Sequence, residues 1–300
     1  MSANLTYLLY SAMWKLVRLL PERAANRLFQ GIAAVAYKRN QKRVQRLRQN
    51  YRQVRPGISE VELEELVKSG LRSAMRYWCE TFRISDWNRD RIIETVTVTR
   101  ENLLTEAIAA RSGLIIALPH AGNWDHAGLY FCTKGITVNT VAEHLKPERL
   151  FQKFLRHREA MGMRVLDLAE SVSSKLEEIL ESGGLVALVA DRDLSKSGIP
   201  VDFFGATAKM PPGPALLAIR TGAPLITAYV AFTNQGIHIE FNGPFTARDA
   251  NSGDTAAQVA EISQQLANQF ARDITENLTS WHMQQRIFVN SAETQVRNFT

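Results

Sequence analysis

The strongest candidate for chemistry in this sequence is a histidine that follows an apolar run. Residues 114–118 are followed by a proline and then by His120, and Asp125 comes five residues later. A histidine can accept a proton near neutral pH, and a neighbouring carboxylate fixes its tautomer and stabilises its charged form. Such a pair activates a hydroxyl group, which is otherwise a poor nucleophile. The spacing predicts a general base at His120 oriented by Asp125; a histidine that only caps the following helix is the alternative.

A second group of charged residues also stands at the end of an apolar run. The apolar residues 185–190 lead directly into three charged ones: Asp191, Arg192 and Asp193. Two carboxylates beside a guanidinium could form part of a polar site, and a solvated turn with an internal ion pair is the alternative. A third, weaker candidate pair is formed by Glu143, which follows a short strand pattern, and Arg158, on the next predicted helix.

Other kinds of chemistry lack their sequence signals. The chain has no His-x-x-x-His pair, and its two cysteines, Cys79 and Cys132, make no metal-ligand spacing, so we expect no metal site. There is no Gly-x-Ser-x-Gly elbow, and the pair Gly183-Gly184 precedes its strand, opposite to the order in a dinucleotide site. We therefore expect neither a bound cofactor nor a covalent enzyme intermediate.

The candidate residues fall in a region where strands and helices alternate. Short apolar or β-branched runs predict strands at residues 113–118, 137–141, 164–166, 185–190, 225–232 and 237–241. Helical periodicity separates them at residues 124–132, 147–161, 172–181 and 214–221, and a long helix follows at 254–277. This order predicts an α/β fold with a mixed, largely parallel central sheet flanked by helices. Catalytic groups in such sheets gather at the carboxyl ends of strands, which is where His120 falls.

The N-terminal part predicts amphipathic helices of unusual charge. Apolar residues recur at three- and four-residue steps from Leu5 to Leu20, and a second such segment follows Pro21. Ten basic and no acidic residues lie between Arg23 and Ser59, against a net charge of +6 for the whole chain, so the remaining residues are net acidic. Ser59, with a glutamate three residues later, forms a capping box that starts a helix over residues 60–82.

This charge distribution divides the chain into two predicted parts. Residues 1–58 are expected to form a basic membrane-docking segment of interfacial helices, and residues 59–300 an α/β body. Apolar and basic faces on one helix suit the surface of an anionic phospholipid membrane, whereas a solvated helix or a nucleic-acid contact is the alternative for the basic residues. Lys15 and Arg18 interrupt the first apolar stretch, so we expect no membrane-spanning helix, and no nucleic-acid partner is favoured.

Several motifs taken together resemble those of the bacterial lipid A acyltransferases. They are His120-Ala-Gly-Asn-Trp-Asp125, Asp191-Arg192-Asp193, Val201-Asp-Phe-Phe-Gly205 and Met210-Pro-Pro-Gly-Pro. Trp14-Lys-Leu-Val-Arg, residues 142–148 and Trp281-His-Met-Gln make the chain more similar still to the phosphatidylinositol mannoside acyltransferases. The resemblance covers residues 8–284, and several motifs in one order are far more specific than a single His-x4-Asp.

The resemblance implies an activity and roles for the candidate residues. It implies transfer of a palmitoyl-type chain from acyl-CoA, a co-substrate, to a mannose hydroxyl of phosphatidylinositol mono- or dimannoside, by a peripheral enzyme at the cytoplasmic face of the cell membrane. His120 would be the general base and Asp125 would orient it; Asp191 stands where the family has an essential glutamate, one methylene longer. Glu143 and Arg158 fall on essential family residues, and these two are expected to bind substrate together with Arg192 and Asp193.

Two alternatives to this activity are open. One is another lipid acyltransferase of the same superfamily, which would act on a lipid A precursor or a glycerol phosphate and could use an acyl carrier protein as donor. The other is a protein without enzymatic activity that binds membranes or nucleic acid through the basic residues before Ser59.

Overall fold

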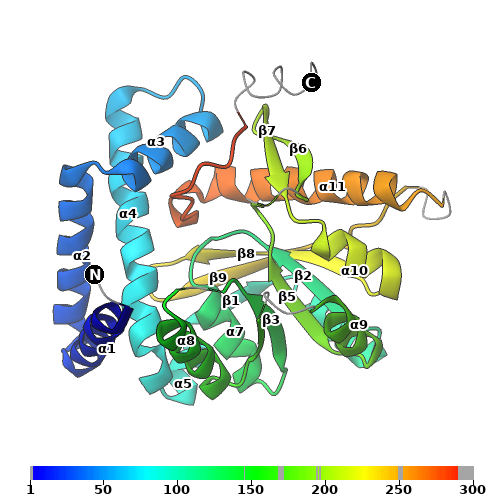
Figure 1. The fold of residues 1–300 in the computed structure, drawn as a ribbon, viewed down its shortest axis with the longest axis horizontal. Coiled ribbons are helices and arrows are strands. Elements are labelled where there is room, and N and C mark those ends of the chain that lie inside the picture. Colours follow the sequence, from blue (N-terminus) through cyan, green and yellow to red (C-terminus); the bar gives the residue numbers. More distant parts are fainter. Residues whose placement is uncertain are drawn as a thin grey trace.

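A seven-stranded mixed sheet forms the centre of the molecule (Figure 1). The computed structural model describes residues 3–144, 146–167, 172–193, 195, 197–248 and 253–289. The strands are β1 (Val96–Thr99), β2 (Leu114–Leu118), β3 (Val138–Ala142), β4 (Arg164–Asp167), β5 (Leu185–Val189), β8 (Leu225–Phe232) and β9 (Ile237–Asn242). Their order is β1-β9-β8-β2-β5-β3-β4, and every neighbouring pair is parallel except β8–β9. The predicted fold class is confirmed.

Helices cover both faces of this sheet. In Figure 1, α10 (Gly213–Thr221) and α11 (Thr255–Glu276) lie above it, and α5 (Arg89–Glu94), α7 (Trp124–Thr133) and α8 (Glu148–Ala160) lie below. The two remaining helices of this part are α6 (Asn102–Ala110) and α9 (Ser173–Glu181). In β2, Ile115 and Ala117 join the apolar cluster that contains α11, whereas Leu114, Ile116 and Leu118 join the cluster that contains α7. Burial on both faces explains why the central strands are apolar without alternation.

The structure also contains a small two-stranded sheet, which the sequence pattern does not predict. The strands β6 (Ile199–Phe203) and β7 (Ala206–Met210) pair antiparallel across a turn at Phe204 and Gly205, both with positive φ. Positive φ at both central residues is typical of the tight turn that suits the twist of a hairpin. A proline and charged residues inside these strands weaken the strand pattern. Asn88 caps the short helix α5, and the strand that follows it covers Val96–Thr99.

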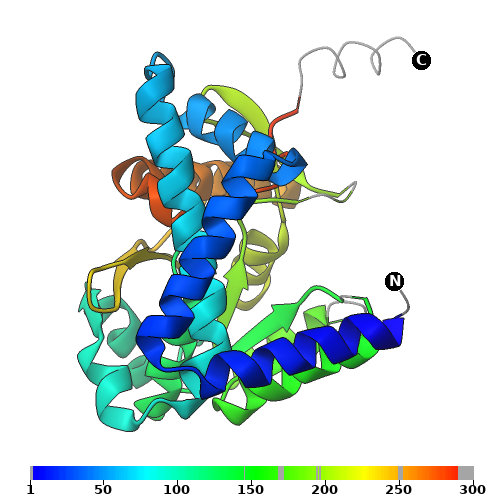
Figure 2. The ribbon, with the colours of Figure 1, turned by 90° about the vertical axis from the view of Figure 1, so that its left-hand side faces the viewer.

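Four N-terminal helices pack beside the sheet: α1 (Ala3–Leu19), α2 (Glu22–Arg39), α3 (Lys42–Val54) and α4 (Glu60–Arg83). Figure 2 shows α2 lying in front of α4, with α1 alongside α8. The predicted capping box is confirmed, because Ser59 and Glu62 exchange side-chain and backbone hydrogen bonds at the start of α4. In the described part of the chain, no helix is long and apolar enough to cross a membrane.

The helix α3 belongs to the same core as the sheet. Its residues Val44, Leu47, Tyr51 and Val54 are buried in the cluster that contains α10 and α11. Two charges of the basic segment are also neutralised by α4, since Arg48 pairs with Glu64 and Arg52 pairs with Glu60, as their atom pairs lie 2.5 and 2.7 Å apart. Within the segment 1–58, α3 is therefore integral to the core, and α2 contributes Ala33 to it. Helices α1 and α2 also expose large apolar side chains on another face.

Candidate active site

The site is built where two neighbouring parallel strands end. In the register of β2 and β5, Leu114 lies opposite Leu185 and Leu118 lies opposite Val189. His120 follows β2 by two residues and Asp191 follows β5 by two residues, so the same register brings them together. Asp191 Oδ1 lies 2.5 Å from His120 Nδ1, and Asp191 Oδ2 accepts the His120 backbone N–H at 3.1 Å.

A tryptophan from the C-terminal end of the described chain completes the surroundings of this carboxylate. The indole N–H of Trp281 donates to Asp191 Oδ2 at 2.8 Å, and both side chains are completely buried. Trp281 also forms a β-bridge with Ala121, and the next residue, His282, donates its backbone N–H to the His120 carbonyl at 2.8 Å. The segment 280–282 therefore holds the loop of residues 119–123 from its other side.

The electrostatics of Asp191 favour the ionised carboxylate. Burial raises its pKa, but the charge of His120 and the hydrogen bonds from His120 and Trp281 outweigh burial, so its pKa lies below the ordinary value. An ionised carboxylate only accepts hydrogen bonds, so the Nδ1 atom of His120 must carry the proton. The Nε2 atom is then the basic one. His120 retains 27% exposure of its side chain, so a substrate hydroxyl can approach it.

The expected contact between Asp125 and His120 is wrong. Asp125, in the first turn of α7, is 2% exposed and accepts hydrogen bonds from Arg158 Nε at 2.7 Å and from the Tyr77 hydroxyl at 3.0 Å. Both of its oxygens are thus taken by groups on α8 and α4. Burial lowers the pKa of Arg158, but the charge of Asp125 outweighs it and holds the guanidinium in its charged form. The carboxylate that orients His120 is Asp191.

The expected pairing of Glu143 with Arg158 is also wrong, because Arg158 is used by Asp125. Glu143 is largely exposed after β3, and its Oε2 atom lies 3.6 Å from Arg192 Nη2. The alternative of a solvated turn at residues 191–193 is wrong for Asp191, which is buried, whereas Asp193 does form a local turn by accepting the Ser195 backbone N–H at 2.6 Å. Glu143 and Arg192 therefore border the His120 end of the sheet, while Asp193 shapes its loop.

Aromatic residues surround the site; Trp124 and Trp281 belong to the motifs named above, whereas nothing in the sequence points to Tyr77. Tyr77 stacks on Trp124 with ring centroids 4.3 Å apart, and Trp124 presents its ring to His120 at 5.7 Å with near-perpendicular planes. No spacing rule points to Tyr77 or Trp281, because each reaches the site from a distant element. The pairing of His120 with Asp191 did have a signal, namely that both residues follow apolar strands at the same offset.

No metal centre is formed by the described residues. Groups of three or more histidine, cysteine, aspartate or glutamate side chains placed to hold a metal ion do not occur among them. His126, the second histidine of the loop region, is buried against Trp87, and burial lowers its pKa to about 4.

The chain is similar to acyltransferases over nearly its whole length. The family model described as bacterial lipid A biosynthesis acyltransferase matches residues 2–289. Phosphatidylinositol mannoside acyltransferase of Mycobacterium tuberculosis (strain CDC 1551 / Oshkosh) is 37% identical over 281 residues, which cover 92% of this chain and 86% of that protein. The protein of the same name from Mycolicibacterium smegmatis (strain ATCC 700084 / mc(2)155) is 36% identical over 288 residues, or 95% of this chain and 92% of that protein.

The buried pair of Asp125 and Arg158 predicts a measurable loss of stability when it is broken. Arg158→Met leaves the Asp125 carboxylate buried without its cation, and we expect the free energy of unfolding to fall by about 3–5 kcal/mol in urea denaturation. Arg158→Lys keeps the charge and should lose less. The double variant Arg158→Met/Asp125→Leu should regain part of the loss, and an Arg158→Met protein of unchanged stability would contradict this account of the pair.

Proposed function

The chain belongs to the bacterial lipid A biosynthesis acyltransferase family, and on this basis we propose that it transfers a palmitoyl-type acyl chain from acyl-CoA to a mannose hydroxyl of a phosphatidylinositol mannoside. The mannoside acceptor is supported by the names of relatives that match nearly the full chain. The observation that carries the proposal for this chain is the His120–Asp191 pair, with Nδ1 of His120 tied to a buried carboxylate and Nε2 left to act as the base.

The proposed reaction is a direct transfer. His120 Nε2 removes the proton of the mannose hydroxyl while that oxygen forms a bond to the thioester carbonyl carbon. The carbon–sulfur bond then breaks, the carbonyl is restored as an ester, and the imidazolium returns the proton to the departing CoA thiolate. Asp191 stabilises the imidazolium between these two steps, because its charge lies against Nδ1–H. No cofactor takes part in this scheme.

The two polar residues at the sheet edge are proposed to receive the sugar. Arg192 follows β5, which pairs with β2, and Glu143 follows β3, which lies on the other side of β5. A carboxylate and a guanidinium together supply both acceptors and donors for sugar hydroxyl groups. Arg158 and Asp125, in contrast, act as a buried support for α7, since both are turned toward each other. Asp193 is proposed to shape the loop that carries Arg192.

Peripheral membrane binding is proposed for the outer faces of α1 and α2. The exposed large apolar residues of the described chain are seven on α1, three on α2 and Val61 on α4. Exposed basic side chains of α2 lie on the same helix as its three apolar ones, for example Arg27 beside Leu28. Apolar insertion combined with positive charge is the property of an interfacial helix at an anionic membrane. We propose that the protein binds there to the cytoplasmic face of the cell membrane.

An acceptor panel tests the proposal for the substrate. The purified protein is incubated with labelled palmitoyl-CoA or palmitoyl-acyl carrier protein and with phosphatidylinositol mono- or dimannoside, a lipid A precursor or glycerol 3-phosphate. We expect acylated mannoside from the CoA donor, detected by mass spectrometry. Acylation of the lipid A precursor alone, which the family's description would favour, or of glycerol 3-phosphate alone would overturn the mannoside assignment.

Substitutions at the pair distinguish its two members. His120→Ala removes the base, and turnover should become undetectable in a protein that retains its circular dichroism spectrum. Asp191→Asn keeps the shape but removes the charge and the tautomer control, with an expected fall in kcat on the order of 10⁴-fold. Asp191→Glu, which keeps the charge, should be more active than Asp191→Asn. Near-normal turnover in folded His120→Ala would exclude the mechanism.

Membrane binding through α1 predicts a specific response to loss of apolar side chains. The triple variant Leu8→Gln/Leu16→Gln/Leu19→Gln should bind vesicles that contain phosphatidylglycerol at least about a hundredfold more weakly, since each of the three inserted leucines contributes more than about 1 kcal/mol. Val61→Gln serves as the matched control, because Val61 is exposed at the start of α4, whereas Trp14 of α1 contacts Phe82 at the other end of that helix. Equal binding by the triple variant and the control in a vesicle flotation assay would exclude α1 as the membrane contact.

A further inference from the structure

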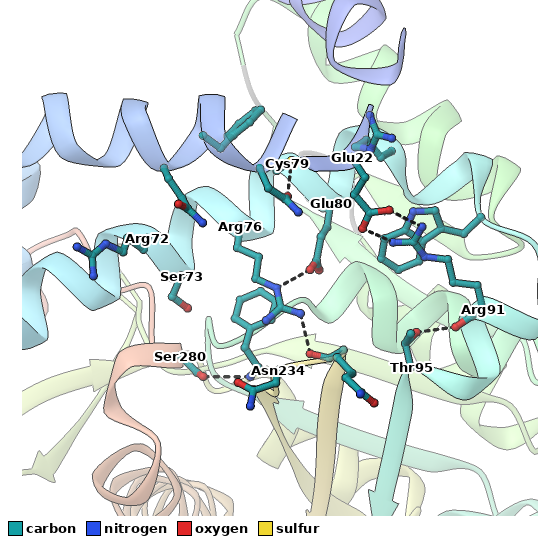
Figure 3. Close-up of a pocket in the computed structure, with 18 of the residues that line it drawn as sticks. Glu22, Arg72, Ser73, Arg76, Cys79, Glu80, Arg91, Thr95, Asn234 and Ser280 are labelled. Atoms are coloured by element: carbon teal, nitrogen blue, oxygen red, sulfur yellow. Dashed lines mark hydrogen bonds and ion pairs between the residues drawn. The ribbon is translucent and has the colours of Figure 1, made fainter. Parts of the chain in front are cut away.

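A polar cavity of about 440 Å³ lies apart from the His120 site (Figure 3). It is enclosed by α2 and α4 on one side and by α5 and the turn between β8 and β9 on the other. Neither His120 nor Asp191 lines it. Its walls are rich in arginine, amide and hydroxyl groups, so the cavity is suited to a polar ligand rather than to an acyl chain.

The charge of the cavity is positive. Four arginines, Arg72, Arg76, Arg83 and Arg91, line it together with two glutamates, Glu22 and Glu80. Both glutamates are already satisfied. The two oxygens of Glu22 accept from the two terminal nitrogens of Arg91 at 2.8 and 2.7 Å, and those of Glu80 accept from Arg76 at 2.6 Å and from Asn123 at 2.9 Å. Among these arginines, the two carboxylates therefore pair only with Arg91 and with one nitrogen of Arg76.

The arginines keep a surplus of N–H donors. A guanidinium has five N–H groups. Arg76 uses three of its nitrogens once each, on Glu80 and on the carbonyls of Thr233 and Gly236, and Arg83 bonds two carbonyls through one nitrogen. Arg72 is exposed and makes no hydrogen bond or ion pair with a described residue. Several donors with positive charge and no acceptor partner are the requirements of an oxyanion site.

Neutral polar groups surround these arginines. The amides of Asn26, Gln30, Asn234 and Gln235 and the hydroxyl of Thr279 line the same cavity. Amides and hydroxyls both donate and accept, as the hydroxyl groups of a polyol require. We propose that this cavity binds a small phosphorylated polyol, with Arg72 and Arg76 on its phosphate. The ligand is either free in solution or the head group of a phospholipid, because α2 walls the cavity and exposes Leu28, Ile32 and Val35.

Two residues that line the cavity also support the loop of residues 119–123, which carries His120. The variant used to test the cavity must therefore leave these two residues unchanged. Glu80 holds Asn123, the cap of α7, and the Ser73 hydroxyl lies 3.0 Å from Nε2 of His282, whose backbone N–H bonds the His120 carbonyl. Changes at Arg76, Glu80 or Ser73 would therefore disturb that loop as well. Arg72 has no such connection, so Arg72→Gln removes a ligand group while leaving the loop's hydrogen bonds in place.

The test is a binding titration that does not depend on acyl transfer. The full chain is labelled with ¹⁵N-tryptophan, and the indole signal of Trp87, which lines the cavity beneath the Arg91 guanidinium at 4.0 Å, is assigned with Trp87→Phe. Inorganic phosphate and glycerol 3-phosphate are added separately at constant ionic strength. We expect a saturable shift of the Trp87 signal, tighter for glycerol 3-phosphate, and an affinity about tenfold lower in Arg72→Gln.

The matched control and a vesicle arm complete the experiment. Arg46→Gln removes an exposed arginine of α3 outside the cavity and should leave the titration unchanged. If the ligand is a lipid head group, Arg72→Gln should also weaken binding to phosphatidylglycerol vesicles relative to Arg46→Gln. The proposal is overturned if neither probe gives a saturable shift and the two variants bind vesicles equally, or if Arg46→Gln weakens the titration as much as Arg72→Gln.

Discussion

The structure depends on one completely buried carboxylate. Removing a carboxylate from water costs several kcal/mol unless nearby donors compensate for the lost hydration. For Asp191 those donors are the His120 ring, the His120 backbone and the Trp281 indole, and they come from two parts of the chain that are both far from Asp191 in sequence. The ends of β2 and β5 and the segment after α11 must therefore meet at one point. The Tyr51 hydroxyl adds α3 to this arrangement, since it donates to the Trp281 carbonyl at 3.1 Å.

A second buried carboxylate, Asp125, lies five residues after His120 and has a different role. Asp125 joins α7 to α8 through Arg158 and to α4 through Tyr77. Tyr77 in turn stacks on Trp124, whose ring faces His120. The two acidic residues thus have different roles. Asp191 sets the tautomer of His120, and Asp125 holds together the helices α4, α7 and α8 near it. Both carboxylates are buried, but Asp191 pairs with His120 and Asp125 pairs with Arg158.

The N-terminal helices differ in how fully they are packed. Helix α3 is as integral to the core as α10 and α11, which pack on the sheet. Its Arg48 and Arg52 form ion pairs with glutamates of α4. Helices α1 and α2 bury only narrow faces, through residues such as Trp14 and Phe29, and leave large apolar side chains in contact with solvent. Exposed apolar surface of this extent is typical of a surface that meets a partner or a membrane. The exposed apolar surface is therefore on α1 and α2, whereas the basic residues are shared by α2, which carries four of them, and α3, which carries five.

Local patterns determine most of the elements and the candidate residues of this protein. Apolar periodicity places β2, β5, β8 and β9 within one or two residues, and it marks His120 and Asp191 as polar residues at strand ends. Which carboxylate meets His120 is decided by tertiary structure, because it follows from β5 lying beside β2 in a register that no short motif encodes. Sequence distance favours Asp125, but the helical turn directs that side chain toward Arg158. Trp281 reaches Asp191 across 90 residues, a contact that exists only once the sheet and the C-terminal segment have packed together.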